Sequence, residues 1–173
     1  TPESFDLQAL FARMRDAGCS HVVMEVSSHA VTLERIGGTH FDIAAFTNLT
    51  EDHLDFHKTM EEYCDAKAEL FRRCGCAVLN RDDAWYDRIA AGATCDMLTT
   101  SKNPSAGLYA QDVELRSDGV AFHAVCRGSR CRVELPIPGG FTVYNALTVL
   151  GVALQLGISL EEAGAALATA SGV

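Results

Sequence analysis

The chain has 173 residues, of which 48% are hydrophobic and 21% are charged, a composition that excludes a disordered or fibrous segment and favours one globular domain. Its formal net charge of -9 and pI near 5.0 argue against nucleic-acid binding, because phosphate contacts need clustered Lys and Arg. No apolar stretch reaches the roughly 20 residues that cross a bilayer, so we expect no membrane insertion.

The seven cysteines are scattered and lack the C-x-x-C pairs of a zinc site. Free thiols in a reducing cytoplasm are the better interpretation. The first residue is Thr1 rather than Met, and the chain stops at Val173 without a capping element. We therefore expect a piece of a longer protein.

Helices and strands alternate along the first part of the chain. Apolar residues at helical spacing predict the helices, and β-rich runs predict the strands. In chain order the expected elements are a helix over 5–17, a strand over 21–26, a helix over 30–36, a strand over 41–47, a helix over 60–73, a strand over 76–79, a helix over 83–91 and a strand over 97–99. This alternation predicts a parallel sheet with helices on both faces.

The pattern changes after Pro104. Three runs with alternating hydropathy, joined by turns that contain Gly, predict an antiparallel meander over 110–115, 120–125 and 131–135. Two helices follow over 143–156 and 160–168, and Ser159 with Glu162 forms a capping box for the second. We predict an α/β fold, a mostly parallel sheet flanked by helices with a small antiparallel β meander.

Polar side chains follow two predicted strands at their carboxyl ends, where open α/β sheets bind ligands. Glu25 closes the first strand, where a buried carboxylate needs a cation. His53 follows the next strand, and a carboxylate with one imidazole suits magnesium or manganese better than zinc. In the competing interpretation Asp52 caps a turn and Glu25 pairs with an Arg. His53 and His57 would then face solvent.

Lys67 lies on the apolar side of the predicted helix over 60–73, on the face that carries Tyr63 and Phe71. A lysine in such a place often extends its stem along apolar surface and keeps its amine in water. Alternatively, burial lowers its pKa and leaves a neutral amine that can react, even with carbon dioxide. A carbamylated lysine is an anion and could bind a metal.

Three further positions could contact anionic or aromatic ligands. Ser27 lies at a strand-to-helix turn, where a hydroxyl and free N–H groups can hold an anion, and helix capping is an equal explanation. Arg35, about two turns along the next helix, could bind a phosphate or carboxylate as a fork. Asn145 opens a helix after a Pro-Gly-Gly turn and could read the edge of a base, although the spacing favours a helix cap.

Four strings of residues match a known family. They are Met24-Glu25-Val26-Ser27-Ser28-His29-Ala30, Phe46-Thr47-Asn48-Leu49-Thr50-Glu51-Asp52-His53-Leu54-Asp55-Phe56-His57, Tyr63 to Phe71 with Lys67, and Pro138-Gly139-Gly140-Phe141-Thr142-Val143-Tyr144-Asn145-Ala146-Leu147. On these strings the chain resembles the central domain of the Mur ligase family over almost its whole length. The first two strings are specific to one branch of the family.

That branch adds the third amino acid, diaminopimelate or lysine, to UDP-MurNAc-L-Ala-D-Glu in peptidoglycan synthesis. The resemblance implies an ATP-dependent, amide-bond-forming ligase of the cytoplasm. ATP would phosphorylate the terminal carboxylate, and the amine of the incoming amino acid would attack the acyl phosphate.

The resemblance also implies roles for particular residues. Glu25, His53 and Lys67 match ligands of Mg²⁺, with Lys67 carbamylated, and Lys67 and His53 are the expected catalytic residues. The matched ligand contacts are Thr1, Ser27 and Arg35 for the UDP-sugar peptide and Asn145 for adenine.

The G-x-x-x-x-G-K-[ST] loop that holds ATP phosphates in this family does not occur in the 173 residues. We therefore expect residues 1–173 to be an incomplete central domain. The phosphate loop, the N-terminal uridine-binding domain and the C-terminal amino-acid-binding domain would lie outside it. The chain alone should be catalytically inactive.

Three alternatives remain at this point. Folylpolyglutamate synthetase and cyanophycin synthetase share the ATP site, but we do not expect them to carry both of the first two strings. A metal-binding or redox module would contain stoichiometric zinc, against which the cysteine spacing argues. A non-catalytic module could keep the fold and bind a UDP-sugar peptide or a metal, but the coexistence of Glu25, His53 and Lys67 disfavours it.

Overall fold

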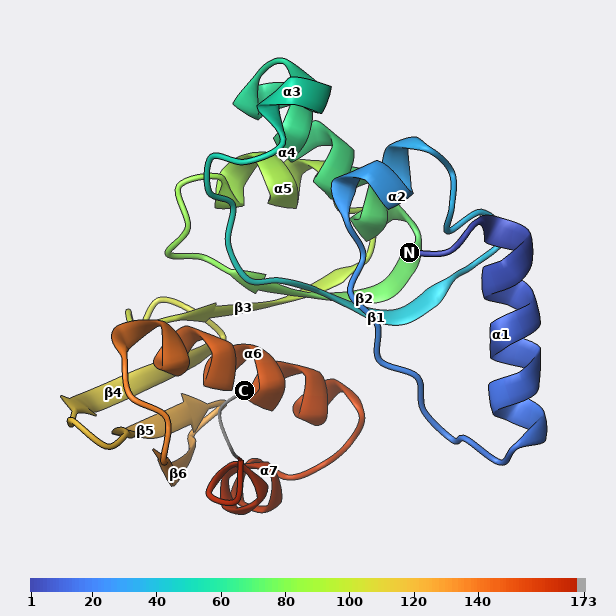
Figure 1. Ribbon diagram of the computed structural model, residues 1–173. Helices are drawn as coiled ribbons and strands as arrows, with labels where there is room; N and C mark the ends of the chain where they lie inside the picture. The colour runs from blue at the N-terminus through green and yellow to red at the C-terminus, as the bar shows by residue number, and fades with distance from the viewer. Residues whose placement is uncertain (171–173) are drawn as a thin grey trace.

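The computed structural model describes residues 1–170, which form a six-stranded sheet with helices against both faces (Figure 1). In sheet order the strands are β1 (Phe41–Phe46), β2 (Cys74–Asn80), β3 (Asp96–Ser101), β4 (Leu108–Leu115), β5 (Val120–Cys126) and β6 (Ser129–Leu135). The helices are α1 (Ser4–Asp16), α2 (Ser28–Thr32), α3 (Leu54–His57), α4 (Met60–Ala68), the 3-10 helix η1 (Glu69–Arg72), α5 (Tyr86–Gly92), α6 (Gly140–Gln155) and α7 (Leu160–Leu167).

The sheet is parallel from β1 to β4 and antiparallel from β4 to β6. The crossover from β1 to β2 runs through α3, α4 and η1, and the crossover from β2 to β3 runs through α5. The predicted α/β fold with a mostly parallel sheet and an antiparallel meander is confirmed. No helix within residues 1–170 is long and apolar enough to span a bilayer.

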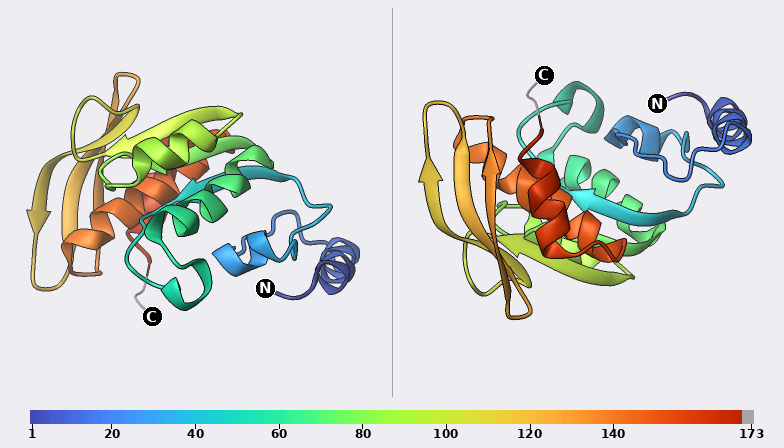
Figure 2. Two further views of the ribbon diagram at one scale, coloured as in Figure 1. Left: turned by 90° about the horizontal axis from the view of Figure 1, so that it is seen from above. Right: turned by 90° about the horizontal axis from the view of Figure 1, so that it is seen from below.

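Two apolar cores cover the two faces of the sheet (Figure 2). On one face α4, η1 and α5 pack on β1 and β2, around Phe71, Leu79 and Ile89. On the other face α6 crosses the sheet and α7 packs on β6, around Phe122 and Leu150. These two layers hold the carboxyl ends of the parallel strands in place.

Gly151 permits the close approach of α6 to β2. A Cβ at this position would lie 2.6 Å from Cγ1 of Val78, well inside van der Waals contact. The helix therefore lies directly against the centre of the parallel strands.

The predicted strand over 21–26 is wrong, so the helix after it does not connect two parallel strands. These residues have no regular secondary structure, and Val23 is 97% exposed. Their β-rich composition does not suffice, because a strand needs a hydrogen-bonding neighbour and no residue of 1–170 pairs with them.

Two predicted helices differ in extent from the observed ones. The helix expected over 60–73 changes to a 3-10 helix at Glu69. The helix expected over 30–36 is α2, which begins at Ser28 and ends at Thr32. The predicted cap of α7 is confirmed, since Oγ of Ser159 accepts a hydrogen bond from N of Glu162 at 3.2 Å.

Candidate functional site

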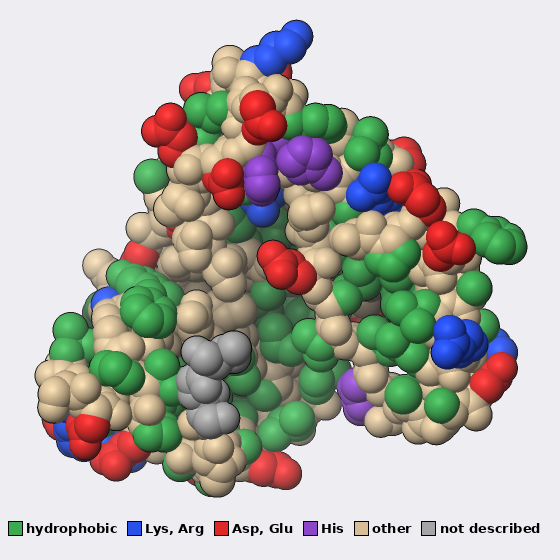
Figure 3. All heavy atoms as spheres, viewed as in Figure 1, with side chains coloured by type: hydrophobic (Ala, Val, Ile, Leu, Met, Phe, Trp, Pro, Cys, Tyr) green, Lys and Arg blue, Asp and Glu red, His purple; other side chains and the backbone are tan. Residues whose placement is uncertain are grey.

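Apart from Asn145 on α6, the predicted site residues lie around α2, α3 and α4, beyond the carboxyl end of β1. β1 leads through residues 47–53 into α3, and both α2 and α3 contact α4. Figure 3 shows histidine side chains together on this face, with acidic side chains beside them. The strand-end rule predicted this place for His53, and the functional role of these residues stays a prediction.

His53 is presented on the outside of this cluster. Its φ of 54° lies in the left-handed region, which is unusual for a residue other than Gly. Its side chain is 42% exposed, and Nε2 lies 3.5 Å from Oδ2 of Asp52. The ring centroids of His53 and His29 are 5.0 Å apart in an edge-on contact. His53 is thus accessible to a ligand while its ring is braced from the side.

His57 and Ser28 form a buried polar pair beneath His53. Ser28 is 1% exposed and His57 is 5% exposed, and Nε2 of His57 lies 2.8 Å from Oγ of Ser28. Burial lowers the pKa of the His57 imidazole, and the neighbouring His29 lowers it further. The interpretation in which His57 faces solvent is wrong.

Lys67 is half-buried on α4, with Nζ 5.1 Å from the ring centroid of Tyr63. Burial lowers the pKa of the Lys67 amine, and the carboxylates of Glu25 and Asp52 partly oppose that shift. A larger share of the amine is therefore neutral than in an exposed lysine. The side chain is directed into the cluster, as the apolar stripe predicts.

Glu25 is exposed in the segment before α2 and lies within the electrostatic reach of Lys67. The competing idea that Glu25 pairs with an Arg fails for the two candidates nearest to this part of the fold. Arg35 pairs with Glu3 at 2.9 Å, and Arg73 pairs with Glu34 at 2.8 Å.

Two of the three predicted magnesium ligands lie beside the ring of Tyr63: the ring centroid of His53 is 5.9 Å and Nζ of Lys67 is 5.1 Å from the Tyr63 ring centroid. In the part of the chain that the structure describes, no three His, Cys, Asp or Glu side chains form a metal-binding group. One carboxylate, one imidazole and a carboxylate borne on Lys67 would be an oxygen-rich ligand set of the kind magnesium takes. The predicted magnesium site requires a carbamate on Lys67 and stays a prediction.

The three predicted contacts to the UDP-sugar peptide lie near α2. Nη1 of Arg35 donates a hydrogen bond to the carbonyl of Thr1 at 3.4 Å, so these two positions are brought together. Oγ of Ser27 accepts a hydrogen bond from N of Ala30 at 3.2 Å and caps α2. The capping explanation for Ser27 is thereby confirmed.

Asn145 is exposed on α6, and the prediction that it caps this helix is wrong. The N-cap is Gly139, whose φ of 107° suits Gly, and α6 already begins at Gly140. The helix starts earlier because Oγ1 of Thr142 bonds the carbonyl of Pro138 at 3.1 Å in its first turn. The Asn145 amide is left available to a ligand.

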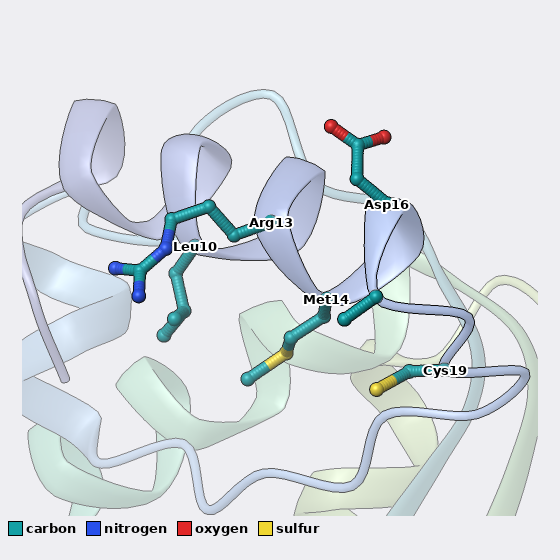
Figure 4. Close-up of a pocket in the computed structure, with 6 residues that line it drawn as sticks. Leu10, Arg13, Met14, Asp16 and Cys19 are labelled. Carbon is teal, nitrogen blue, oxygen red and sulfur yellow. The ribbon is translucent and has the colours of Figure 1, made fainter.

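A hollow of about 440 Å³ lies apart from these residues, between α1 and the segment that follows it (Figure 4). It is lined by Leu10, Arg13, Met14, Asp16, Ala17 and Cys19. None of these residues belongs to the predicted site, which is formed by strand ends and short helices instead.

The geometry agrees with the family to which the sequence points. The sequence model of the Mur ligase middle domain matches residues 1–153. The chain belongs to the Mur ligase family.

This Mur ligase domain is 45% identical over 168 residues to the UDP-N-acetylmuramoyl-L-alanyl-D-glutamate–2,6-diaminopimelate ligase of Corynebacterium glutamicum, covering 93% of the chain and 32% of the relative. It is 44% identical over 176 residues to the ligase of the same name from Gloeobacter violaceus, covering 100% of the chain and 36% of the relative. A solved structure with that ligase name superposes with a TM-score of 0.93 at 31% identity, covering 100% of the chain and 37% of the solved chain. The chain spans about a third of the length of these relatives.

Sequence reasoning missed a second group of residues in this Mur ligase domain, in the loop after β2. Nδ2 of the buried Asn80 donates to the carbonyl of Thr47 at 2.7 Å, and Oδ2 of Asp83 accepts from N of Leu49 at 3.1 Å. These bonds fasten the loop that leads to His53. The signal was present, since Asn80 to Asp83 follow a predicted strand directly and the strand-end rule applies to them as well.

Proposed function

We propose that this chain is the middle domain of an ATP-dependent ligase that adds diaminopimelate to UDP-MurNAc-L-Ala-D-Glu in peptidoglycan synthesis. Identity of 40% or more along nearly the whole chain to several ligases of that name supports the choice of diaminopimelate over lysine. The observation that carries the chemistry is Lys67, half-buried with a lowered pKa in the field of Glu25 and Asp52.

In this proposal the neutral Lys67 amine takes up carbon dioxide and releases one proton, which gives a carbamate. Glu25, His53 and that carbamate would hold Mg²⁺, which would supply charge neutralisation for the phosphoryl group. The terminal carboxylate of the substrate attacks the γ-phosphorus of ATP, which breaks the bond to the β-phosphate, forms an acyl phosphate and releases ADP. The amine of diaminopimelate then displaces phosphate and forms the amide.

The remaining predicted residues take binding roles in the proposal. Thr1, Ser27 and Arg35 contact the UDP-sugar peptide, and the Arg35 guanidinium favours its anionic groups. Asn145, exposed on α6, contacts adenine. The phosphate loop and the uridine- and amino-acid-binding domains belong to the rest of a cytoplasmic protein.

The test replaces Lys67 by Ala in the full-length protein and measures formation of the UDP-MurNAc-tripeptide. Because Lys67 would stabilise charge that develops in the transition state, we expect kcat to fall by about 10²–10³-fold. Small carboxylates such as acetate should restore part of the rate.

The control is Arg15→Ala, since the Arg15 side chain is a 76% exposed cation on α1 and belongs to none of the proposed contacts. It should leave kcat within about twofold of wild type, as expected for a surface substitution. Unchanged turnover in Lys67→Ala would overturn the proposed role of the carbamate.

A further inference from the structure

The hydrogen bond between Ser28 and His57 connects two segments that are 29 residues apart. Ser28 is the first residue of α2, and His57 is the last residue of α3. Both side chains are almost fully buried, and neither belongs to the residues proposed to hold metal or substrate. A buried polar group is kept where its hydrogen bond fixes a geometry that an apolar contact would leave loose.

The imidazole of His57 continues this connection to α4. Its ring stacks on Tyr63 with centroids 5.1 Å apart and planes inclined by 19°. Tyr63 is itself buried, and the amine of Lys67 lies over the ring of Tyr63, one helical turn further along α4. The contacts run from Ser28 through His57 and Tyr63 to the reactive amine.

The hydrogen bond to Ser28 fixes the orientation of the His57 ring, which packing alone would not do. Rotation of the His57 ring about its side-chain bonds would break the 2.8 Å contact with Ser28. The ring plane is therefore fixed, and with it the surface on which Tyr63 stacks. Tyr63 in turn limits where the flexible Lys67 side chain can place its amine.

We propose that Ser28, His57 and Tyr63 form a buried support that positions the Lys67 amine for the ligase reaction. Ser28 and His57 act as positioning residues, because they reach the reacting groups only through Tyr63 and Lys67. This inference rests on the proposed function. It adds the residues that set the geometry of the carbamate to those that hold the ion and the substrates.

Removing a single hydrogen bond of the support should lower kcat strongly. A displacement of a reacting group by about 1 Å can cost about 10²-fold in rate. We therefore expect Ser28→Ala and His57→Phe, made in the full-length ligase, to lower kcat by about 10- to 100-fold. His57→Phe keeps an aromatic ring against Tyr63 and removes only the hydrogen bond.

Two readouts separate positioning from a loss of stability. The KM for the UDP-sugar peptide should stay within about twofold of wild type, because binding to Thr1 and Arg35 is not touched. The bicarbonate concentration that gives half-maximal activity should rise, and the carbamate signal in ¹³C NMR after incubation with ¹³C-bicarbonate should weaken. A purely structural role would lower the melting temperature without moving either quantity.

A double-mutant cycle tests whether the two residues act together. The variant with both Ser28→Ala and His57→Phe should lose no more turnover than the worse single variant, since either change removes the same bond. Tyr63→Phe keeps the ring and should retain about ten times the turnover of Tyr63→Leu or more. This comparison keeps the test decisive if a His57 variant does not fold.

Thr148→Val is the matched control for a buried hydroxyl elsewhere. Oγ1 of Thr148 bonds the carbonyl of Tyr144 at 3.0 Å within α6, outside the support. It should leave kcat and bicarbonate dependence unchanged.

Suppose that Lys67→Ala is inactive but that folded Ser28→Ala and His57→Phe enzymes keep the wild-type kcat and carbamate signal. This result would overturn the proposal about the support and leave the proposed function standing. Wild-type turnover of Lys67→Ala would overturn the role of the carbamate, whereas a full-length wild-type protein that forms no UDP-MurNAc-tripeptide would overturn the proposed function itself.

Discussion

The parallel half of the sheet and the antiparallel meander bury different kinds of residue. In the meander, β4 to β6 with α6 and α7 enclose an almost entirely apolar core, and the charged side chains of the strands pair at the surface. In the parallel half, Ser28, His57 and Asn80 are buried together with their hydrogen-bond partners. The buried hydroxyls of the meander half, Thr142 and Thr148 on α6, donate only to carbonyls four residues earlier, whereas the buried polar groups of the parallel half join segments far apart in sequence.

Backbone conformation shows the same contrast. The left-handed residues of the meander, Asp112 and Arg127, lie in a β-bulge and a hairpin turn, where such φ values serve strand geometry. His53 and Lys58 flank the single turn of α3 instead. Strained residues without a turn to explain them are common at functional sites. The meander therefore supports the fold, and the predicted site residues lie mainly in the loops and short helices beyond the parallel strands.

Shortening a large side chain in the apolar core of the meander should cause the largest loss of stability. Phe122 is fully buried at the centre of β5, and Phe122→Ala removes its contacts and leaves a cavity. We expect the free energy of unfolding of the 173-residue chain to fall by about 3–5 kcal/mol. Urea denaturation measures this. A loss below about 1 kcal/mol would mean that the meander does not carry the fold.

Alkaline pH should destabilise the parallel half through its buried thiols. Burial raises the pKa of Cys64 to about 11 and that of Cys74 to about 12, from 9.0. Above pH 9 the unfolded chain loses these protons while the folded chain keeps them, so stability falls as pH rises toward the folded pKa values. The slope is at most about 1.4 kcal/mol per pH unit and thiol.

Urea denaturation between pH 8 and about 10.5, under reducing conditions, tests this dependence. Cys64→Ala should flatten the decline, because it removes one of the two thiols. Cys19→Ala, at an exposed cysteine, should leave the decline as it is in wild type. Equal slopes in all three chains would contradict the assignment to Cys64.

Removing one helix cap in each half should lower stability in both cases but lower turnover in only one. Oγ1 of Thr59 accepts from N of Glu62 at 3.1 Å at the start of α4, and Ser159 caps α7 in the same way. Thr59→Ala and Ser159→Ala should each lower the free energy of unfolding by about 1 kcal/mol. In the full-length ligase only Thr59→Ala should also lower kcat, because α4 carries Lys67. Equal kcat in both variants would weaken the contrast between the two halves.

Surface ion pairs of the meander should matter least. Arg130 pairs with Asp112 at 2.8 Å, and both side chains are about half exposed. Arg130→Ala should change the free energy of unfolding by less than about 0.5 kcal/mol, since water and salt screen such pairs. A salt titration of wild type and variant checks this, and the small difference should shrink further at high salt.

Local pattern was enough to predict most of the fold. The apolar spacing of α1, α6 and α7 and the Gly turns of the meander depend on neighbours in sequence, so these elements were predicted with small errors in their ends. The strand expected over 21–26 failed because its formation depends on a partner strand. The cap expected at Asn145 failed because Gly139 and Thr142 start α6 earlier.

The same distinction applies to the site. Lys67 was predicted because its neighbours on one helix face are visible in the sequence, and the structure places it as expected, half-buried with a lowered pKa. The pairing of Ser28 with His57 was not predicted, since nothing in either local pattern indicates which distant residue will meet it. Contacts between chain segments need the fold before they can be read.

The small size of α2 and α3 has a consequence for how the protein moves. Helices of five and four residues are not stable alone, so these two depend on the Ser28–His57 bond and the stack on Tyr63 that join them to α4. They should open as one unit, at a lower free energy than global unfolding. In native-state hydrogen exchange, the amide protons of α2 and α3 should exchange together and well before those of α6.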